Sequence, residues 1–209
     1  RYVFIREWNP NTSSYDVKQQ DFGFAASEAR KVRPNASLIA TAAQYGVSLA
    51  KQLVTSHVGS NIDQFGRQVN DTVQLARSAA FFAQEDALRT QLSHLLASWD
   101  LGLHDVLVRE LQSITPEGKT ENFWLPFGVH QMANGGSFEL PFNLESSGTQ
   151  GAFVLLHRLL PVLRSGGLAV IDEFENDLHP LMLEPILDLF ANPATNPLGA
   201  QLLFTCHAI

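Results

Sequence analysis

The sequence predicts an α/β protein built on a parallel sheet, with an added helical subdomain and β-hairpins. Three observations lead to this fold class. A short apolar run, Leu168-Ala-Val-Ile171, has the composition of a strand that is buried in a parallel sheet. Apolar residues at helical spacing precede it over residues 153–163, and a second strand-like run follows at residues 201–205. Strands that alternate with helices are typical of α/β folds.

Two adjacent carboxylates, Asp172 and Glu173, follow the first apolar run directly. Because an unpaired carboxylate is costly to bury, we expect both at the open carboxyl end of the strand, where α/β sheets bind ligands. One acid can then help to hold Mg²⁺ beside a phosphate, and the other can position or deprotonate a water molecule. This is the pattern of a Walker B motif. The alternative is a strand that ends in a solvated acidic turn.

The composition excludes several classes of protein. The chain has 209 residues, of which 45% are hydrophobic and 17% charged, so we expect a globular protein. The net charge of −7 argues against a generally basic nucleic-acid surface but not against a local patch. The single cysteine, Cys206, excludes an internal disulfide and fits a reducing, cytoplasmic compartment. No apolar run approaches the roughly 20 residues that span a bilayer, so we expect no membrane partner.

Residues 1–34 are expected to form a β-hairpin at the edge of the sheet. Side chains alternate from Arg1 to Glu7, turn-forming residues follow, and residues 15–24 can return as a second strand. Arg1 and Arg6 could meet a phosphate, but charges on an edge strand usually face water.

Residues 35–112 are expected to form a helical subdomain. Asn35 or Ser37 can cap its first helix, and apolar residues recur at helical spacing along the segment. Gly59-Ser-Asn61 and Gly66 separate the helices, and residues 101–108 resemble a helix end that turns into a strand. The isolated histidines lack metal-ligand spacing and are expected to be structural or solvated; they are His57, His94 and His104.

Gly118-Lys119-Thr120 copies only the last three positions of a phosphate-binding P-loop. The complete motif needs a glycine five residues earlier, where this sequence has Ser113, and it needs a strand before the loop and a helix after it. We therefore expect a surface loop here. Residues 123–130 and 137–144 are apolar-rich and are joined by Asn134-Gly-Gly136, which predicts a hairpin.

The hexapeptide Glu145-Ser-Ser-Gly-Thr-Gln150 precedes the apolar helix that Gly166-Gly167 ends. A loop rich in serine and glycine at a helix N-terminus offers hydroxyl and free N–H groups to an anion. The alternative is plain capping of the helix by Ser146 or Ser147.

Beyond Glu173, Pro180 suits the first turn of a helix that continues to residue 190. Residues 201–205 then form a second buried strand, which ends at Cys206 and His207. His207 is therefore expected beside Asp172 and Glu173, although a lone histidine at a strand end is more often structural.

Three motifs in this order resemble the second half of an ABC-type ATPase. They are the loop of residues 145–150, the run from Leu168 to Glu173, and the run Leu202-Leu-Phe-Thr-Cys-His207. The resemblance is strongest to the AAA-like ATP-binding protein group allied to the OLD, RecF and SMC ATPases, whose signature motif often reads Glu-Ser-x-Gly-Thr. It covers residues 100–209 well. It implies an ABC-ATPase-like P-loop NTPase fold, with residues 1–34 and 113–209 in the ATPase core.

The resemblance also implies a role for the residues at the ends of the two strands. Asp172 would hold Mg²⁺ through water, and Glu173 would orient or activate the attacking water. His207 would be the switch histidine at the γ-phosphate of ATP. These roles agree with the chemistry of phosphoryl transfer, which depends mostly on positioning and charge stabilisation.

Further residues are implied at a dimer interface that closes around ATP. Ser146, Ser147, Gly148 and Thr149 would form the signature loop, which in this family touches the γ-phosphate bound to the opposite subunit. Asn176 and Asp177 would lie in the D-loop at the dimer seam. The implied partners are ATP, a second copy of the chain, and a nucleic-acid-linked or phage-defence effector.

The sequence departs from the family because it has no Walker A lysine and no clear Q-loop. The start at Arg1 and the end at Ile209, just after an apolar strand, suggest a fragment that lacks the Walker A lobe and hydrolyses ATP poorly or not at all. Two other functions stay open. One is an ATP-gated structural clamp with slow turnover, and the other is a degenerate partner-binding module, against which the retained Asp172, Glu173 and His207 argue.

Overall fold

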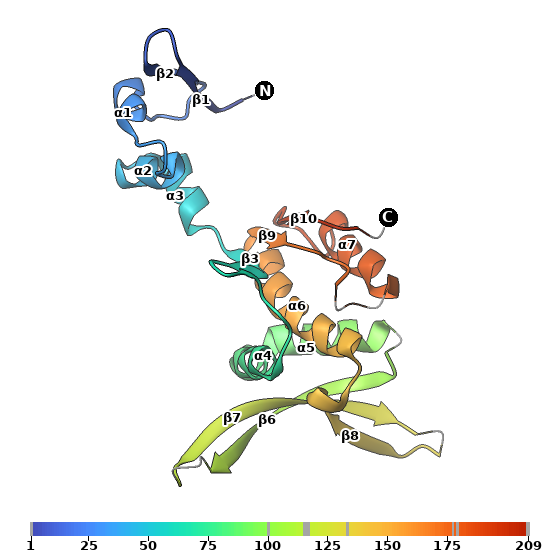
Figure 1. Ribbon diagram of the computed structural model, residues 1–209. Coiled ribbons are helices and arrows are strands. Elements are labelled where there is room, and N and C mark those ends of the chain that lie inside the picture. The colour runs from blue at the N-terminus through green and yellow to red at the C-terminus, as the bar shows by residue number, and fades with distance from the viewer. Residues whose placement is uncertain are drawn as a thin grey trace. The chain divides into compact units, whose positions relative to one another are not determined.

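The computed structural model describes residues 2–99, 101–114, 118–132, 134–176, 178 and 180–207. The chain divides into two compact units, Arg1–Ser56 and His57–Ile209. The division therefore falls after residue 56, whereas the sequence suggested boundaries after residues 34 and 112 (Figure 1).

The first unit combines a hairpin with three short helices. Strands β1 (Phe4–Asn9) and β2 (Ser14–Gln19) are antiparallel, and helices α1 (Ala26–Lys31), α2 (Leu38–Gln44) and α3 (Ser48–Thr55) follow. The predicted hairpin is confirmed, and among the described residues its strands pair only with each other. Its stability comes from a separate small core, which contains Phe22, Phe24, Ala29, Val32, Ala42, Val47 and Ala50.

The predicted cap of the first long helical segment is confirmed at Ser37. The Ser37 hydroxyl accepts a hydrogen bond from the N–H of Ala40 at 3.2 Å, which satisfies a free donor in the first turn of α2.

The second unit contains a parallel sheet, two antiparallel sheets and four α-helices among its described residues. In chain order the elements are β3 (Val58–Ser60), β4 (Ile62–Asp63), β5 (Gly66–Arg67), α4 (Thr72–Gln84), α5 (Asp86–Ser98), β6 (Leu103–Ile114), β7 (Thr120–Gln131), β8 (Ser137–Pro141), α6 (Ser147–Ser165), β9 (Leu168–Ile171), α7 (Leu183–Ala191) and β10 (Gln201–Phe204). Short 3₁₀ turns, Phe142–Leu144 and Pro180–Met182, precede α6 and α7. The predicted helix start at Pro180 is thus confirmed as a 3₁₀ turn that leads into α7.

The parallel sheet has the strand order β10-β9-β3, so the run from Leu168 to Ile171 is its central strand. Ala169 and Ile171 are fully buried, which confirms the predicted core strand. The prediction that residues 201–205 form a buried strand is wrong. β10 lies at the edge of this sheet, and its Leu203 is 61% exposed, because no described strand pairs with its outer side.

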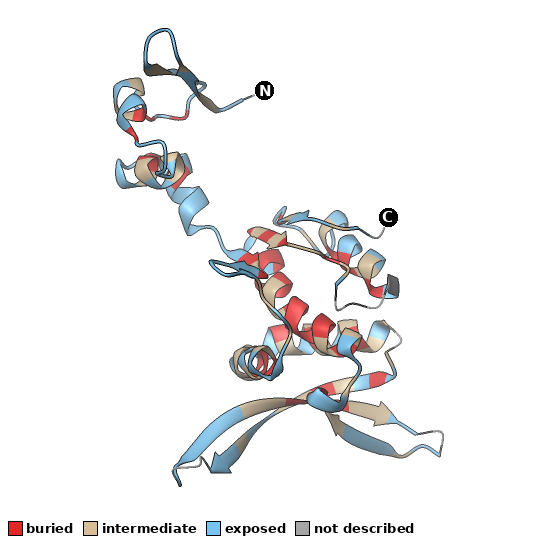
Figure 2. Ribbon diagram, viewed as in Figure 1, coloured by how far each residue is buried: buried red, intermediate tan, exposed pale blue. Residues whose placement is uncertain are grey.

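Helix α6 runs through the core of the second unit and packs against β3 and β9 (Figure 2). Its buried residues include Phe153, Leu156, Leu159 and Leu160. The helix ends as predicted at Gly166, whose φ of 69° is left-handed and favours glycine. Among the described residues, no helix combines the length and the apolar character that crossing a membrane requires.

The segment of residues 35–112 is less helical than expected. Residues 58–67, where a break between helices was expected, form β3, β4 and β5. The turn from helix end to strand expected at residues 101–108 is confirmed, because β6 begins at Leu103 and continues to Ile114. β3 depends on pairing with β9, more than a hundred residues away in sequence, which a local periodicity cannot reveal. Gly59 allows this strand to approach α6, because a Cβ atom there would lie 2.3 Å from the carbonyl oxygen of Arg158.

Strands β6, β7 and β8 form an antiparallel sheet in the order β6-β7-β8. The hairpin predicted around Asn134-Gly-Gly136 is confirmed by the pairing of β7 with β8. Gly118 and Lys119 lie in the connection between β6 and β7, and Thr120 begins β7. Since a strand and not a helix follows, rejection of this segment as a P-loop is also confirmed.

Candidate functional site

Asp172 and Glu173 follow β9 at the carboxyl end of the parallel sheet, as the sequence predicts. The Asn61 side chain holds the backbone of Asp172 from the neighbouring β3. Its Nδ2 donates to the Asp172 carbonyl and its Oδ1 accepts from the Asp172 N–H, both at 2.8 Å. Asn61 is buried, and this paired contact continues the β3–β9 ladder beyond its last residue pair, Ser60 with Val170. The start of the acidic segment is therefore fixed by two hydrogen bonds.

Thr205 binds the acidic segment from the other side, just after β10. Its hydroxyl donates to Asp172 Oδ1 at 2.6 Å and accepts from the N–H of Glu173 at 2.8 Å. The Thr205 carbonyl also accepts from the N–H of Phe174 at 2.9 Å. These contacts orient the Asp172 carboxylate and turn the chain away from the strand direction.

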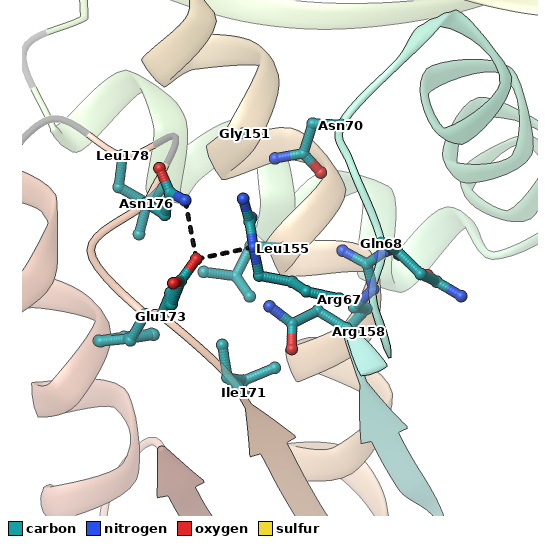
Figure 3. A pocket seen from close by; sticks show the side chains of 12 residues that line it. Arg67, Gln68, Asn70, Gly151, Leu155, Arg158, Ile171, Glu173, Asn176 and Leu178 are labelled. Atoms are coloured by element: carbon teal, nitrogen blue, oxygen red, sulfur yellow. Dashed lines mark hydrogen bonds and ion pairs between the residues drawn. The ribbon is translucent and has the colours of Figure 1, made fainter. Parts of the chain in front are cut away.

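Glu173 has a φ of 50°, which is uncommon for a residue other than glycine. Its carboxylate leaves the strand end and meets two donors (Figure 3). Arg67 Nε lies 2.9 Å from Glu173 Oε2, and Asn176 Nδ2 donates to the same oxygen at 3.0 Å. The Glu173 side chain is 40% exposed, so it is held in place but remains accessible to solvent.

A small cavity of about 20 Å³ lies beside Glu173. A space of this size holds about one water molecule and not a nucleotide. It is lined by Asn61, Arg67, Gln68, Asn70, Gly151, Leu155, Arg158, Ile171, Glu173, Phe174, Asn176 and Leu178 (Figure 3). Arg158 donates through Nη2 to Gln68 Oε1 at 2.8 Å, and burial lowers the pKa of its guanidinium. The cavity is thus polar, with two arginines and one carboxylate.

His207 approaches the acidic segment through its backbone. Its N–H donates to Glu175 Oε1 at 2.9 Å, and this hydrogen bond is the main cause that lowers the pKa of the Glu175 carboxyl. Among the described residues, the imidazole of His207 makes no hydrogen bond with Asp172 or Glu173. The structure therefore brings the His207 backbone to the same segment without a contact between the imidazole and Asp172 or Glu173.

Of the two predicted D-loop residues, Asn176 contacts Glu173 directly. The other, Asp177, lies outside the described residues.

The predicted signature loop lies at the N-terminus of α6. Ser146 caps this helix, since its Oγ accepts from the N–H of Thr149 at 3.1 Å. The two hydroxyls also lie 2.8 Å apart, and Thr149 is buried. The capping role considered for Ser146 is therefore present, and Ser147 and Gly148 begin the helix.

Helix α6 connects the loop to the cavity beside Glu173. Gly151 and Leu155 both line this cavity, four and eight residues after Ser147, where α6 begins. At about 1.5 Å per residue, they lie about 6 Å and about 12 Å along the helix from Ser147. Among the described residues, no hydrogen bond joins the loop to Asp172 or Glu173.

Glu145, the first residue of the loop motif, is anchored to the antiparallel sheet. Its Oε1 lies 2.7 Å from His130 Nε2, and both side chains are largely buried. A Cβ atom at Gly128 would lie 2.5 Å from the same carboxylate oxygen, so glycine leaves room for the pair. The Glu145 carbonyl also accepts from Gln150 Nε2 at 2.9 Å.

The oxygen atoms at the end of β9 fit a magnesium ion. Mg²⁺ is usually bound by one or two carboxylates together with water and phosphate oxygens, and it does not need a cage of protein ligands. Asp172 provides such a carboxylate beside the Thr205 hydroxyl. The described part of the chain has no group of three or more histidine, cysteine, aspartate or glutamate side chains that could enclose a metal. The described oxygen atoms thus fit a metal that is shared with a phosphate.

Several residues of this site were not found from the sequence. Asn61 was assigned to a break between helices, and Arg67 and Thr205 were given no role. The useful signal was present in Gly59-Ser-Asn61, a glycine-containing segment that ends in a polar side chain. Its contact with Asp172 spans 111 residues, which the sequence alone does not show.

Together, the parallel sheet and the carboxylates at the end of its central strand define an α/β domain of the P-loop NTPase-like class. Residues 18–208 match the family described as "AAA domain, putative AbiEii toxin, Type IV TA system". The chain belongs to this family and, with it, to the nucleotide-binding, ATPase-type AAA domains. No curated protein matches the chain.

Proposed function

We propose that this chain supplies the Walker B carboxylates, the signature loop and the switch histidine of an ABC-type ATPase allied to OLD, RecF and SMC. The full-length protein binds ATP and Mg²⁺ between two copies and hydrolyses the γ-phosphate bond. Asp172 holds Mg²⁺ through water, Glu173 orients the attacking water and takes its proton, and His207 lies at the γ-phosphate. When bound, Mg²⁺ would neutralise negative charge on the phosphate groups of ATP. We expect the isolated chain, which has no Walker A lysine motif, to turn over ATP poorly or not at all.

One observation carries this proposal: both carboxylates lie at the carboxyl end of the central parallel strand and are held in place. Asn61 and Thr205 hold Asp172, and Arg67 and Asn176 hold Glu173. A solvated acidic turn does not need contacts from so many elements. The water-sized cavity beside Glu173 suits a carboxylate that positions a single water molecule.

The proposal also includes a second copy of the chain. Ser146, Ser147, Gly148 and Thr149 lie at the N-terminus of α6, and among the described residues no hydrogen bond joins them to Asp172 or Glu173. In the dimer, the loop of one copy contacts the γ-phosphate that the carboxylates of the other copy face. Asn176 and Asp177 then lie at the seam between the copies.

The test uses the full-length protein that contains this chain, with Glu173→Gln. We expect kcat for ATP hydrolysis to fall by about 100-fold or more, because the residue that activates water is lost. ATP binding should persist, so that light scattering detects dimers of the variant with Mg-ATP and monomers without it. Glu85→Gln is the matched control. Glu85 also pairs with an arginine, Arg164, and its side chain is 34% exposed, yet it lies outside the site.

Each outcome separates the candidate functions. Dimers that depend on ATP, together with lost turnover, support the carboxylate and signature-loop roles. ATP binding without dimers argues against the loop role of residues 146–149. Tight ATP-dependent dimers of the wild type with little phosphate release favour the slow structural clamp. Failure to bind ATP rejects the proposal in favour of a partner-binding module.

We also propose that the ATPase controls an effector of the toxin or phage-defence kind, because the family description names a toxin of a type IV toxin–antitoxin system. Induced expression of the full-length protein should then arrest growth of its host. Glu173→Gln should relieve this arrest, and Glu85→Gln should not. Equal arrest by all three proteins would separate toxicity from ATP turnover.

A further inference from the structure

The 61–68 hairpin, which contains β4 and β5, contacts the backbone of Asp172 and the carboxylate of Glu173. It is closed by a hydrogen bond of 2.7 Å from the Gln68 N–H to the Asn61 carbonyl. Ile62 pairs with Arg67 across the two short strands. The turn between the strands is braced by Asp63, whose Oδ1 accepts from the N–H of Phe65 at 2.7 Å. The hairpin is therefore a compact unit.

Two contacts anchor the ends of the 61–68 hairpin. At one end, Asn61 binds the backbone of Asp172 through two hydrogen bonds of 2.8 Å. At the other end, Gln68 accepts a hydrogen bond of 2.8 Å from Arg158, which belongs to α6. Because both neighbours are core elements, the hairpin places Arg67 at a defined position in front of Glu173. Figure 3 shows Arg67 reaching the Glu173 carboxylate from this hairpin.

The contact with Arg67 leaves one side of the Glu173 carboxylate available. Arg67 and Asn176 both bind Oε2, at 2.9 and 3.0 Å. Within the described residues no hydrogen bond is made by Oε1, which can therefore accept from a water molecule. A free glutamate side chain populates several rotamers, and holding one oxygen removes most of that freedom before the reaction.

We propose that Arg67 is a positioning residue that holds the Glu173 carboxylate in the orientation needed to bind the attacking water. This inference rests on the proposed function, since it assigns Arg67 to the same ATPase site. Arg67 acts through Glu173 and not on the nucleotide. Its loss should therefore lower kcat and leave KM for ATP nearly unchanged.

The experiment compares Arg67→Ala, Arg67→Lys and Glu173→Gln in the full-length protein. We expect Arg67→Ala to lower kcat by about 10- to 100-fold, which is the effect of a misplaced catalytic group, with KM changed less than about twofold. Arg67→Lys should recover kcat to within about threefold of wild type, because the contact with Glu173 is made by one nitrogen, Nε, and an ammonium group can replace it. Arg164→Ala is the matched control, since Arg164 also forms an ion pair with a glutamate, Glu85, at 2.7 Å.

A double variant tests whether Arg67 acts through Glu173. If it does, Arg67→Ala combined with Glu173→Gln should be no slower than Glu173→Gln alone. A second measurement needs no nucleotide. In thermal unfolding, Arg67→Ala and Glu173→Gln should each lower Tm by about 2 °C, and the double variant should lower it no further than either single variant.

Three results would overturn the inference: an unchanged or raised kcat in Arg67→Ala, a Lys variant as slow as the Ala variant, or multiplied losses in the double variant. A raised kcat would mean that Arg67 restrains Glu173 instead of positioning it. Failure of the proposed function looks different. In that case Glu173→Gln itself retains kcat, or the wild-type protein does not hydrolyse ATP, and the inference is overturned together with it.

Discussion

Protonation of His157 should destabilise the protein as the pH falls from 7 to 5. His157 lies on α6. Its Nδ1 atom is 2.9 Å from Ser78 Oγ, and the centroid of its imidazole ring is 4.5 Å from the centroid of the Phe81 ring. Burial is the main cause that lowers the pKa of His157 to about 4, with further contributions from the charges of Arg158 and His57. The imidazole therefore stays neutral in the folded protein at pH values where it is charged in the unfolded chain.

The size of the effect follows from the two pKa values of His157. The ordinary value is 6.5 and the folded value is about 4. At pH values between 4 and 6.5, the His157 side chain binds more protons in the unfolded chain than in the folded protein. The free energy of unfolding is therefore highest above pH 6.5 and falls as the pH falls toward 4. The expected loss is about 1 kcal/mol at pH 6, about 2 kcal/mol at pH 5, and about 3 kcal/mol well below pH 4.

Urea denaturation at pH 7 and pH 5 measures this loss, with His157→Gln as the reference. Glutamine does not titrate, and its amide can still bond to the buried Ser78 hydroxyl. Groups that do not interact with His157 contribute equally in both proteins and cancel in the comparison. The wild type should lose about 2 kcal/mol more than the variant over this range. Equal losses would refute the argument that burial keeps His157 neutral.

Two further substitutions test contacts around the site and in the core. Thr205→Val removes the hydroxyl that bonds to Asp172 and to the Glu173 N–H, so kcat should fall about 10-fold and half-maximal turnover should need more Mg²⁺, measured by titration of the full-length protein. Thr205→Ser keeps the hydroxyl and should behave like wild type; equal defects in both variants would contradict this. Gly59→Ala should lower the free energy of unfolding by more than about 2 kcal/mol, since its Cβ would lie 2.3 Å from a backbone oxygen of α6. An unchanged urea midpoint would contradict that close packing.

Features with a local physical cause were predictable from the sequence. The central strand β9 was found because four apolar residues precede Asp172 and Glu173. A strand that ends at the edge of a sheet buries the apolar residues and leaves the two carboxylates accessible, and few other arrangements do both. The end of α6 was found because Gly166 accepts a left-handed conformation that other residues avoid. In each case the explanation lies within a few residues of the feature.

Features that depend on distant pairing were not predictable. β3 has three residues and no helical or alternating pattern, and only its pairing with β9 makes it a strand. The contacts of Asn61 and Arg67 with the acidic pair arise from that pairing. Three of the four residues of β10 are apolar, yet Leu203 and Phe204 are exposed, because an apolar composition does not distinguish an edge strand from a central one.

The buried pair between His130 and Glu145 has a mechanical consequence. Glu145 directly precedes Ser146, which caps α6, while His130 belongs to β7 of the antiparallel sheet. This single contact links the antiparallel sheet to the capped end of α6. A displacement of β7 is therefore passed to the loop through the His130–Glu145 pair.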